Sequence, residues 1–133
     1  MRKARFSART ADKYDLYQRA VQAPEDDVRF LARLFRRLRG RPARHLREDF
    51  CGTGLLAATW IARHAKNTAE GFDIDAEPVE WGRQHNFVPL GEAAQRMHFH
   101  LADVREKSLQ RPDVRVAFNF SYCGLRTRAE LMD

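Results

Sequence analysis

A glycine turn between a short strand candidate and an apolar segment most constrains what this chain can fold into. Residues 48–54 read EDFCGTG, and the apolar run 55–58 follows at once. This pattern predicts a strand that ends in a tight turn and passes straight into a helix. Gly52 and Gly54 would let the backbone N–H groups and the positive helix end approach a ligand closely. A cofactor is expected here if the chain binds one, although an ordinary strand-to-helix loop has the same pattern.

The second informative feature is an acid that lies 19 residues past Gly54. Asp73 follows a short strand candidate, Thr68–Phe72. A carboxylate at this spacing can accept hydrogen bonds from both hydroxyls of a ribose. Asp75 is expected to cap the next helix, because Pro78 favours a first helical turn there. The turn and the spaced acid together favour a nucleotide-type cofactor, with helix capping by Asp73 as the alternative.

The remaining pattern predicts strands that alternate with helices, which is typical of a parallel α/β sheet. The expected strands are His45–Phe50, Thr68–Phe72, Met97–Leu101 and Val114–Phe120. The expected helices are Ala11–Val21, a segment from Pro24 to just before Gly40, Leu55–Ala65 and Pro78–Phe87. The second of these helices begins with acids and ends with arginines, which complements the helix dipole.

Composition is that of a single intracellular domain. The chain has 133 residues, no apolar run long enough for a membrane span and no apolar leader at its start, so a cytoplasmic location is expected. Cys51 and Cys123 lack metal-ligand spacing and are expected to be small buried thiols. His98 and His100 would share a strand face, but a third metal ligand is missing. They are expected to be hydrogen-bonded or solvent-facing, and no metal site is predicted.

Basic residues gather before the first expected strand. The formal net charge is +6, and the cluster comprises Arg36, Arg37, Arg39, Arg41, Arg44 and Arg47. Such a cluster can bind nucleic acid electrostatically. A solvated helix face is the alternative that we favour, because no aromatic residues are interleaved with the charges.

Several of these segments resemble the class I S-adenosylmethionine-dependent methyltransferases, and more narrowly a bacterial subgroup whose substrate is unassigned. The resemblance is carried by residues 46–54, 71–75, 82–86 and 119–123, with residues 11–17 and 21–25 also similar. The first motif of the class has an acid and then three glycines at alternate positions. Glu48 matches the acid, and Gly52 and Gly54 match the second and third glycines. Phe50 stands where the first glycine is expected.

The resemblance implies S-adenosyl-L-methionine as the cofactor. Asp103 would accept a hydrogen bond from the adenine amino group, and Val104 would offer its N–H to the ring, although Asp103 could instead cap a turn. Tyr14 and Tyr17 would belong to a helical extension, residues 1–40, that covers the cofactor as a lid, with simple packing on the sheet as the alternative. The cofactor-binding residues implied are Glu48, Phe50, Cys51, Gly52, Gly54, Asp73, Ile74, Asp103, Val104 and Asn119.

The resemblance says less about the methyl acceptor than about the cofactor. Amino-group methyltransferases carry Asn or Asp, two prolines and an aromatic residue after the fourth strand. Asn119 and Tyr122 match this signature and would position the substrate, whereas Phe120 and Ser121 replace the prolines. Transfer to nitrogen is therefore weakly supported, and transfer to oxygen or carbon stays open. No catalytic base is assigned, because methyl transfer depends mainly on positioning.

The resemblance also implies that the chain is the N-terminal half of such an enzyme. Residues 41–133 would form a partial, doubly wound Rossmann-like sheet of order 3-2-1-4 that stops before a fifth strand. An open edge would favour self-association or pairing with a missing C-terminal half. The acceptor could be a small molecule, a protein or RNA, and no membrane partner is expected. A non-catalytic remnant or interaction module, and an arginine-rich nucleic-acid-binding fragment, are the alternative functions.

Overall fold

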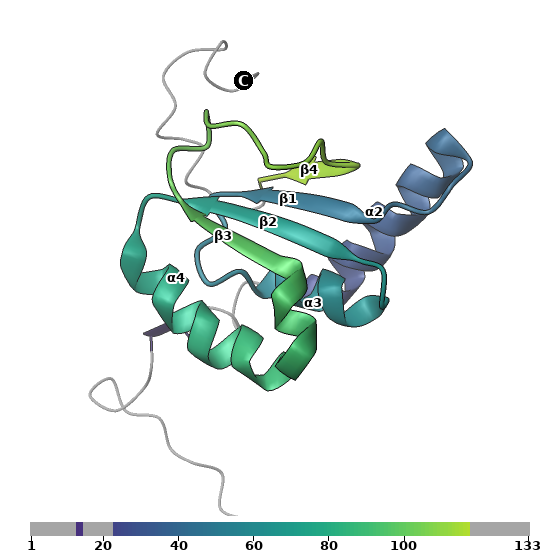
Figure 1. Cartoon of the computed structure of the whole chain (residues 1–133). Coiled ribbons are helices and arrows are strands. Elements are labelled where there is room, and N and C mark those ends of the chain that lie inside the picture. The colour runs from purple at the N-terminus through teal and green to yellow at the C-terminus, as the bar shows by residue number, and fades with distance from the viewer. Residues whose placement is uncertain (1–12, 15–22, 118–133) are drawn as a thin grey trace, which may run out of the picture.

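The computed structural model describes residues 13–14 and 23–117 (Figure 1). These residues contain a four-stranded, fully parallel sheet of order β3-β2-β1-β4. The strands are β1 (His45–Asp49), β2 (Thr68–Asp73), β3 (Met97–Leu101) and β4 (Val114–Val116). All four expected strands and their order are therefore confirmed. The part of β4 expected beyond residue 117 lies outside the described residues.

The helices follow the capping signals of the sequence. They are α2 (Pro24–Arg39), α3 (Leu55–Arg63), α4 (Ala76–Gly82), the π-helical η1 (Arg83–Phe87) and the 3-10 segment η2 (Val88–Arg96). Helix α2 ends at Gly40, whose φ of 72° is left-handed and whose N–H donates to the Arg36 carbonyl at 2.8 Å. The helix expected at Ala11–Val21 lies outside the described residues except for Lys13 and Tyr14. Among the helices described, none has the length and hydropathy to cross a membrane.

One face of the sheet carries the apolar core. Side chains alternate along each strand, so Leu46 of β1, Ala69 of β2 and Val116 of β4 point to the same side. Helices α2, α3 and α4 lie on that side of the strands (Figure 1). The fully buried Trp60 and Ile61 of α3 pack into this core. Burial of this apolar area is the main stabilising contribution.

The other face of the sheet is polar and is covered by a loop. After β3 the chain crosses to β4, on the far side of β1, through residues 102–113 without forming a helix (Figure 1). A loop has no internal ladder of hydrogen bonds, so its backbone groups need partners from the strands beneath it. Those partners are charged and polar side chains at alternate strand positions. We call this side the loop face.

Candidate functional site

The strand order reverses at β1, which lies between β2 and β4. In parallel α/β sheets, ligands bind at the carboxyl ends of the strands where the order reverses. The glycine turn leaves β1 at this end, and Asp73 is the last residue of the neighbouring β2. The fold thus brings together the glycine turn and the spaced acid, the two sequence features that favoured a nucleotide-type cofactor.

The turn from β1 to α3 is built from left-handed residues. Phe50, Gly52 and Gly54 have φ values of 53°, 53° and 71°. The Gly54 N–H donates to the Cys51 carbonyl at 2.8 Å, which closes the turn. A Cβ on Gly54 would lie 2.9 Å from the Phe99 ring. Glycine is therefore required at position 54 both by the backbone and by packing.

Asp73 is hydrogen-bonded to the glycine turn. Its Oδ2 accepts from the Gly52 N–H at 2.8 Å, and its Oδ1 accepts from the Asp75 N–H at 2.9 Å. These two bonds use two of the about four acceptor positions of a carboxylate, so the side chain retains capacity for hydroxyl donors. Asp75 caps α4 as expected, because its side chain accepts from the Glu77 N–H at 3.3 Å.

Glu48 is a buried acid beneath the turn, with 5% of its surface exposed. Its Oε1 has no hydrogen-bond partner within the described part of the chain. Burial raises the pKa of Glu48 to about 8, and the negative charges of Asp73 and Asp49 add to the rise. A hydrogen bond from the Ala57 backbone, in the first turn of α3, opposes it. An orphaned buried carboxyl oxygen is costly and indicates a site for a cationic or hydrogen-bonding ligand.

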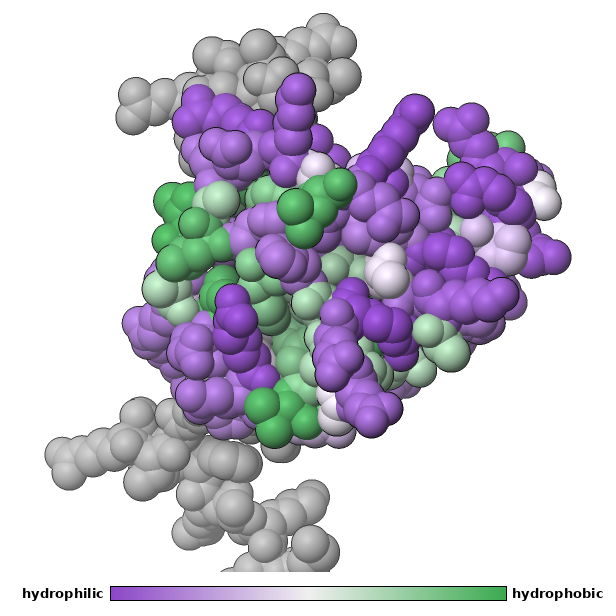
Figure 2. Space-filling view, viewed as in Figure 1, coloured by the Kyte–Doolittle hydropathy of each residue, from purple (hydrophilic) through white to green (hydrophobic). Residues whose placement is uncertain are grey.

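Asp103 and Val104 form a turn just after β3. The Arg105 guanidinium binds Asp103 through Nε at 3.0 Å and Nη2 at 2.8 Å, and these contacts lower the pKa of Asp103 to about 2. The carboxylate is therefore charged at neutral pH. Ile74 and Leu101 are 76% and 58% exposed. Figure 2 shows hydrophobic residues gathered at the left of an otherwise largely hydrophilic face, over the carboxyl ends of β2 and β3.

Sequence reasoning missed the role of Gly82 and Asn86. A Cβ on Gly82 would lie 2.0 Å from the Thr53 carbonyl oxygen, so only glycine lets α4 approach the turn this closely. Asn86 then donates from Nδ2 to the same carbonyl at 3.0 Å. A glycine within a helical pattern was the available signal, since it often marks a close backbone approach.

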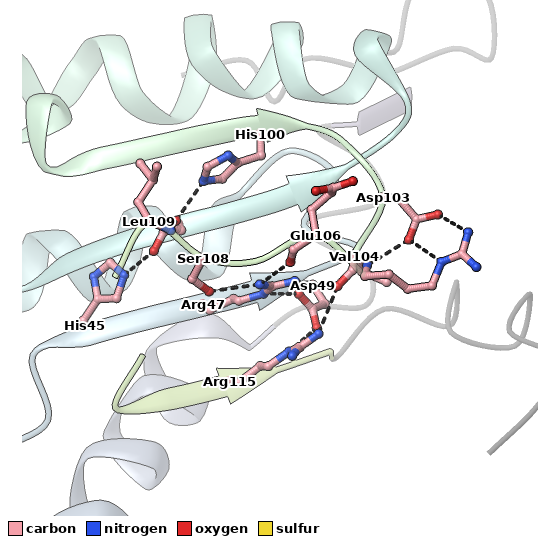
Figure 3. A network of polar contacts seen from close by, with 12 residues as sticks. His45, Arg47, Asp49, His100, Asp103, Val104, Glu106, Ser108, Leu109 and Arg115 are labelled. Atoms are coloured by element: carbon pink, nitrogen blue, oxygen red, sulfur yellow. Dashed lines mark hydrogen bonds and ion pairs between the residues drawn. The ribbon is translucent and has the colours of Figure 1, made fainter. Parts of the chain in front are cut away.

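The charged network of the loop face was also missed (Figure 3). The buried Arg47 donates to Asp49 at 2.7 Å, to the Val104 carbonyl at 2.5 Å and to the Glu106 carbonyl at 2.8 Å. Arg115 binds the other oxygen of Asp49 at 2.6 Å. Sequence alone places these residues on strands, but it does not show that a loop buries them.

A second carboxylate, Glu70, anchors the far half of the same loop. It accepts from the Leu109 N–H at 2.7 Å and binds His45 at 2.5 Å and His100 at 2.8 Å. His100 is thus one of the hydrogen-bonded histidines expected from the sequence, and its ring lies 4.5 Å from that of His98. No group of three metal-binding side chains occurs among the residues described.

Cys51 and Tyr14 also lie within the described part of the chain. Cys51 is a buried free thiol, and burial raises its pKa. Tyr14 packs against Trp81 of α4, with ring centroids 5.6 Å apart. Asn119, Tyr122, Tyr17 and Cys123 lie outside the described residues.

The arginine cluster does not form one basic surface. Arg36, Arg37 and Arg39 are exposed at the end of α2. Arg41, in contrast, pairs with Asp113 at 2.8 Å, and Arg47 is buried. The nucleic-acid alternative loses part of its expected binding surface.

Solved structures of known proteins share this fold. An amino pentose methyltransferase from Micromonospora echinaspora, CalS10, solved with S-adenosylmethionine bound, matches with a TM-score of 0.67 and 20% identity over 98% of this chain and 50% of its own. The sugar N-methyltransferase KedS8 of Streptoalloteichus sp. ATCC 53650 matches with a TM-score of 0.65 and 21% identity over 98% of this chain and 49% of its own. DesVI of Streptomyces venezuelae matches with a TM-score of 0.69 and 22% identity over 95% of this chain and 50% of its own.

The chain spans about half the length of these solved structures. No protein-family model matches the chain, and no curated protein matches it. The Rossmann-like parallel sheet of order 3-2-1-4, expected from the sequence, is confirmed, and methyltransferases of known structure share this fold.

Proposed function

We propose that this chain is the cofactor-binding half of an S-adenosylmethionine-dependent methyltransferase. The observation that carries the proposal is the hydrogen bond that joins the glycine turn to Asp73, close enough to the buried Glu48 for the Asp73 charge to raise its pKa. Solved structures of the same fold include methyltransferases, one of them with S-adenosylmethionine bound.

The residues present fit this cofactor chemically. The amino acid end of S-adenosylmethionine carries an ammonium group, and the unpartnered Oε1 of Glu48 is an acceptor for such a group. Gly54 begins α3 without a side chain that could cap it. The first turn of α3 therefore presents backbone donors to the carboxylate at the same end of the cofactor.

The nucleoside end fits the carboxyl ends of β2 and β3. Asp73 retains acceptor positions for the two ribose hydroxyls. Ile74 and Leu101 offer exposed apolar surface to an adenine ring. Asp103 would accept from the adenine amino group, and Val104 would donate its N–H to the ring. The sulfonium of the bound cofactor supplies an electrophilic methyl group, so the chain must mainly hold and orient it.

The acceptor and the lid remain proposals from the sequence. Asn119 and Tyr122 would position the methyl acceptor, and the N-terminal extension, residues 1–40, would cover the cofactor through Tyr14 and Tyr17. CalS10 acts on an amino pentose, and KedS8 methylates a sugar nitrogen. Amino sugars are therefore the first acceptors to screen. A cytoplasmic location is also proposed, supported by the free buried thiol of Cys51.

The edge of β4 supports a further proposal about partners. Within the described residues β4 pairs with β1 alone, and its outer edge is where the resemblance implies a fifth strand. We propose that this edge pairs with a complementary half or with a second copy of the chain. Light scattering of the purified chain tests self-association, and a monodisperse monomer at high concentration would argue against it.

Calorimetric titration with S-adenosylhomocysteine tests the function. The wild-type chain should bind with micromolar affinity, and Asp73→Ala should weaken binding about 10- to 100-fold, as expected for the loss of hydrogen bonds to a charged acceptor. Asp75→Ala is the matched control, since Asp75 caps α4, and it should bind like the wild type. A folded wild-type chain that does not bind would overturn the proposal and favour a non-catalytic remnant.

A further inference from the structure

Two arginines of the loop face meet at a single backbone carbonyl, and one carboxylate bridges them. The Val104 carbonyl accepts from Arg47 Nη2 at 2.5 Å and from Arg115 Nη2 at 3.0 Å. Asp49 bridges the same two arginines, because its Oδ1 accepts from Arg47 Nε at 2.7 Å and its Oδ2 from Arg115 Nε at 2.6 Å. Figure 3 shows the three side chains converging from β1 and β4 on the turn after β3. We call this group the arginine clamp.

The clamp fixes the orientation of one peptide unit. The carbonyl of Val104 and the N–H of Arg105 belong to the same planar group, and that N–H donates to Asp103 Oδ1 at 2.8 Å. Two guanidinium groups therefore bind the carbonyl of this peptide, and the Asp103 carboxylate binds its N–H. Because the plane is rigid, the Asp103 side chain is coupled to the clamp through the Arg105 N–H. The Val104 N–H belongs to the preceding peptide plane, which joins this one at the Val104 Cα, so the clamp restrains that donor through a single Cα.

We infer that Arg47, Asp49 and Arg115 are positioning residues for adenine recognition, acting through the Val104 peptide. The inference rests on the proposed function, in which Asp103 and Val104 read the adenine edge. The clamp pre-orders a turn that would otherwise have to be ordered on binding, and pre-ordering of this kind favours affinity and selectivity. The charged groups come from β1, at which the strand order reverses, and from the neighbouring β4, so the turn is held directly by the sheet.

A purely structural role for the network makes a different prediction, and the chain contains a control for it. Glu70 anchors the same loop further along, where it accepts from the N–H groups of Leu109 and Gln110 at 2.7 and 3.3 Å. If general anchoring of the loop were sufficient, loss of Glu70 and loss of the clamp would have the same effect on ligand binding. If the clamp positions the Val104 peptide, loss of the clamp alone should alter how the base is read.

The readout is selectivity between S-adenosylhomocysteine and its hypoxanthine counterpart, S-inosylhomocysteine. Hypoxanthine replaces the amino donor of adenine with a carbonyl and the adjacent ring acceptor with an N–H. A carboxylate acceptor and a backbone donor in fixed positions reject this pattern, because the carboxylate would then face a carbonyl acceptor and the backbone N–H would face another N–H donor. The wild-type chain should bind S-adenosylhomocysteine at least about tenfold more tightly.

Calorimetry on wild type, Arg115→Gln, Arg47→Lys, Glu70→Gln and Asp73→Ala separates the two roles. Both clamp variants should lose about tenfold in affinity for S-adenosylhomocysteine while the affinity for S-inosylhomocysteine is unchanged. The ratio of the two affinities should therefore fall about tenfold. Glu70→Gln should keep the ratio. Asp73→Ala should weaken both ligands equally, because it acts on the ribose. Arg115 has a side chain that is 36% exposed, so Arg115→Gln decides the matter if the buried Arg47→Lys does not fold.

The outcomes are distinguishable. A preserved ratio in Arg115→Gln, or equal binding of both ligands by the wild type, would overturn the inference and leave the proposed function standing. A ratio lost equally in Glu70→Gln would also overturn it, in favour of general loop anchoring. A wild-type chain that binds neither ligand would overturn the proposed function and the inference with it.

Discussion

The backbone N–H of Gly52 donates a 2.8 Å hydrogen bond to Oδ2 of Asp73, which joins the glycine turn to the acid 19 residues past Gly54. Asp73→Ala removes the acceptor for this N–H and for that of Asp75. We expect the free energy of unfolding, measured by urea denaturation, to fall by about 2–3 kcal/mol. Asp75→Ala, which removes only a helix cap, should cost about 1 kcal/mol. Equal losses of unfolding free energy in the two variants would show that the hydrogen bond between Gly52 and Asp73 does not stabilise the chain.

Gly82 should tolerate no side chain. A Cβ there would lie 2.0 Å from the Thr53 carbonyl oxygen, and this contact is with backbone on both sides, so neither partner can rotate away. Gly82→Ala should destabilise the chain by about 3 kcal/mol or more and move the glycine turn. Gly40→Ala is the control, because a Cβ at position 40 meets nothing within 4 Å. Its cost should be about 1 kcal/mol, from the left-handed backbone alone.

The fold and part of the site could be predicted from the sequence. The four strands, the bounds of α2 and the capping role of Asp75 all depend on local signals: alternation, glycine stops and an acid before a first helical turn. The pairing of Gly52 with Asp73 follows from topology, since neighbouring parallel strands end at the same edge.

The loop face could not be predicted in the same way. His45, Arg47 and Asp49 alternate along β1, which is the pattern of a strand whose polar side faces solvent. They are buried because the connection after β3 crosses the sheet as a loop, and nothing local in the sequence indicates that this segment lies over β1. The same limit explains why Arg47 was grouped with the arginines expected to be solvated, although it is 2% exposed.

The π-helical turn at η1 was missed for a related reason. A single helix over residues 78–87 was expected, whereas α4 begins at Ala76 and widens from Arg83 onward. The contact of Gly82 and Asn86 with the Thr53 carbonyl lies at this change. Such turns often occur at functional sites, where a tertiary contact outweighs the regular hydrogen-bond ladder.

Phe50 stores backbone strain at the first glycine position of the motif. Its φ of 53° is unfavourable for any residue with a Cβ. Phe50→Gly and Phe50→Ala both remove the ring, but only glycine relieves the left-handed conformation. We therefore expect the glycine variant to be more stable than the alanine variant by about 1 kcal/mol in urea denaturation. An alanine variant of equal or greater stability would show that position 50 is not strained.

The buried carboxyl of Glu48 should make the stability of the chain depend on pH. Burial raises its pKa in the folded state to about 8, above the ordinary value of 4.5. The folded chain therefore binds more protons than the unfolded chain between these values. Stability should be fully present below pH 4.5 and should fall as the pH rises toward 8, by up to about 1.4 kcal/mol per pH unit from this group.

Urea denaturation of the wild type and Glu48→Gln between pH 5 and 8 checks this dependence. Glutamine cannot ionise, so the free energy of unfolding of the variant should decline less steeply with pH, and the two curves should diverge in favour of the variant toward pH 8. Glu92→Gln is the control, because Glu92 is exposed, and its curve should run parallel to that of the wild type. A parallel curve for Glu48→Gln would mean that Glu48 is already charged in the folded chain, in which case a protein group or ion must partner its buried oxygen.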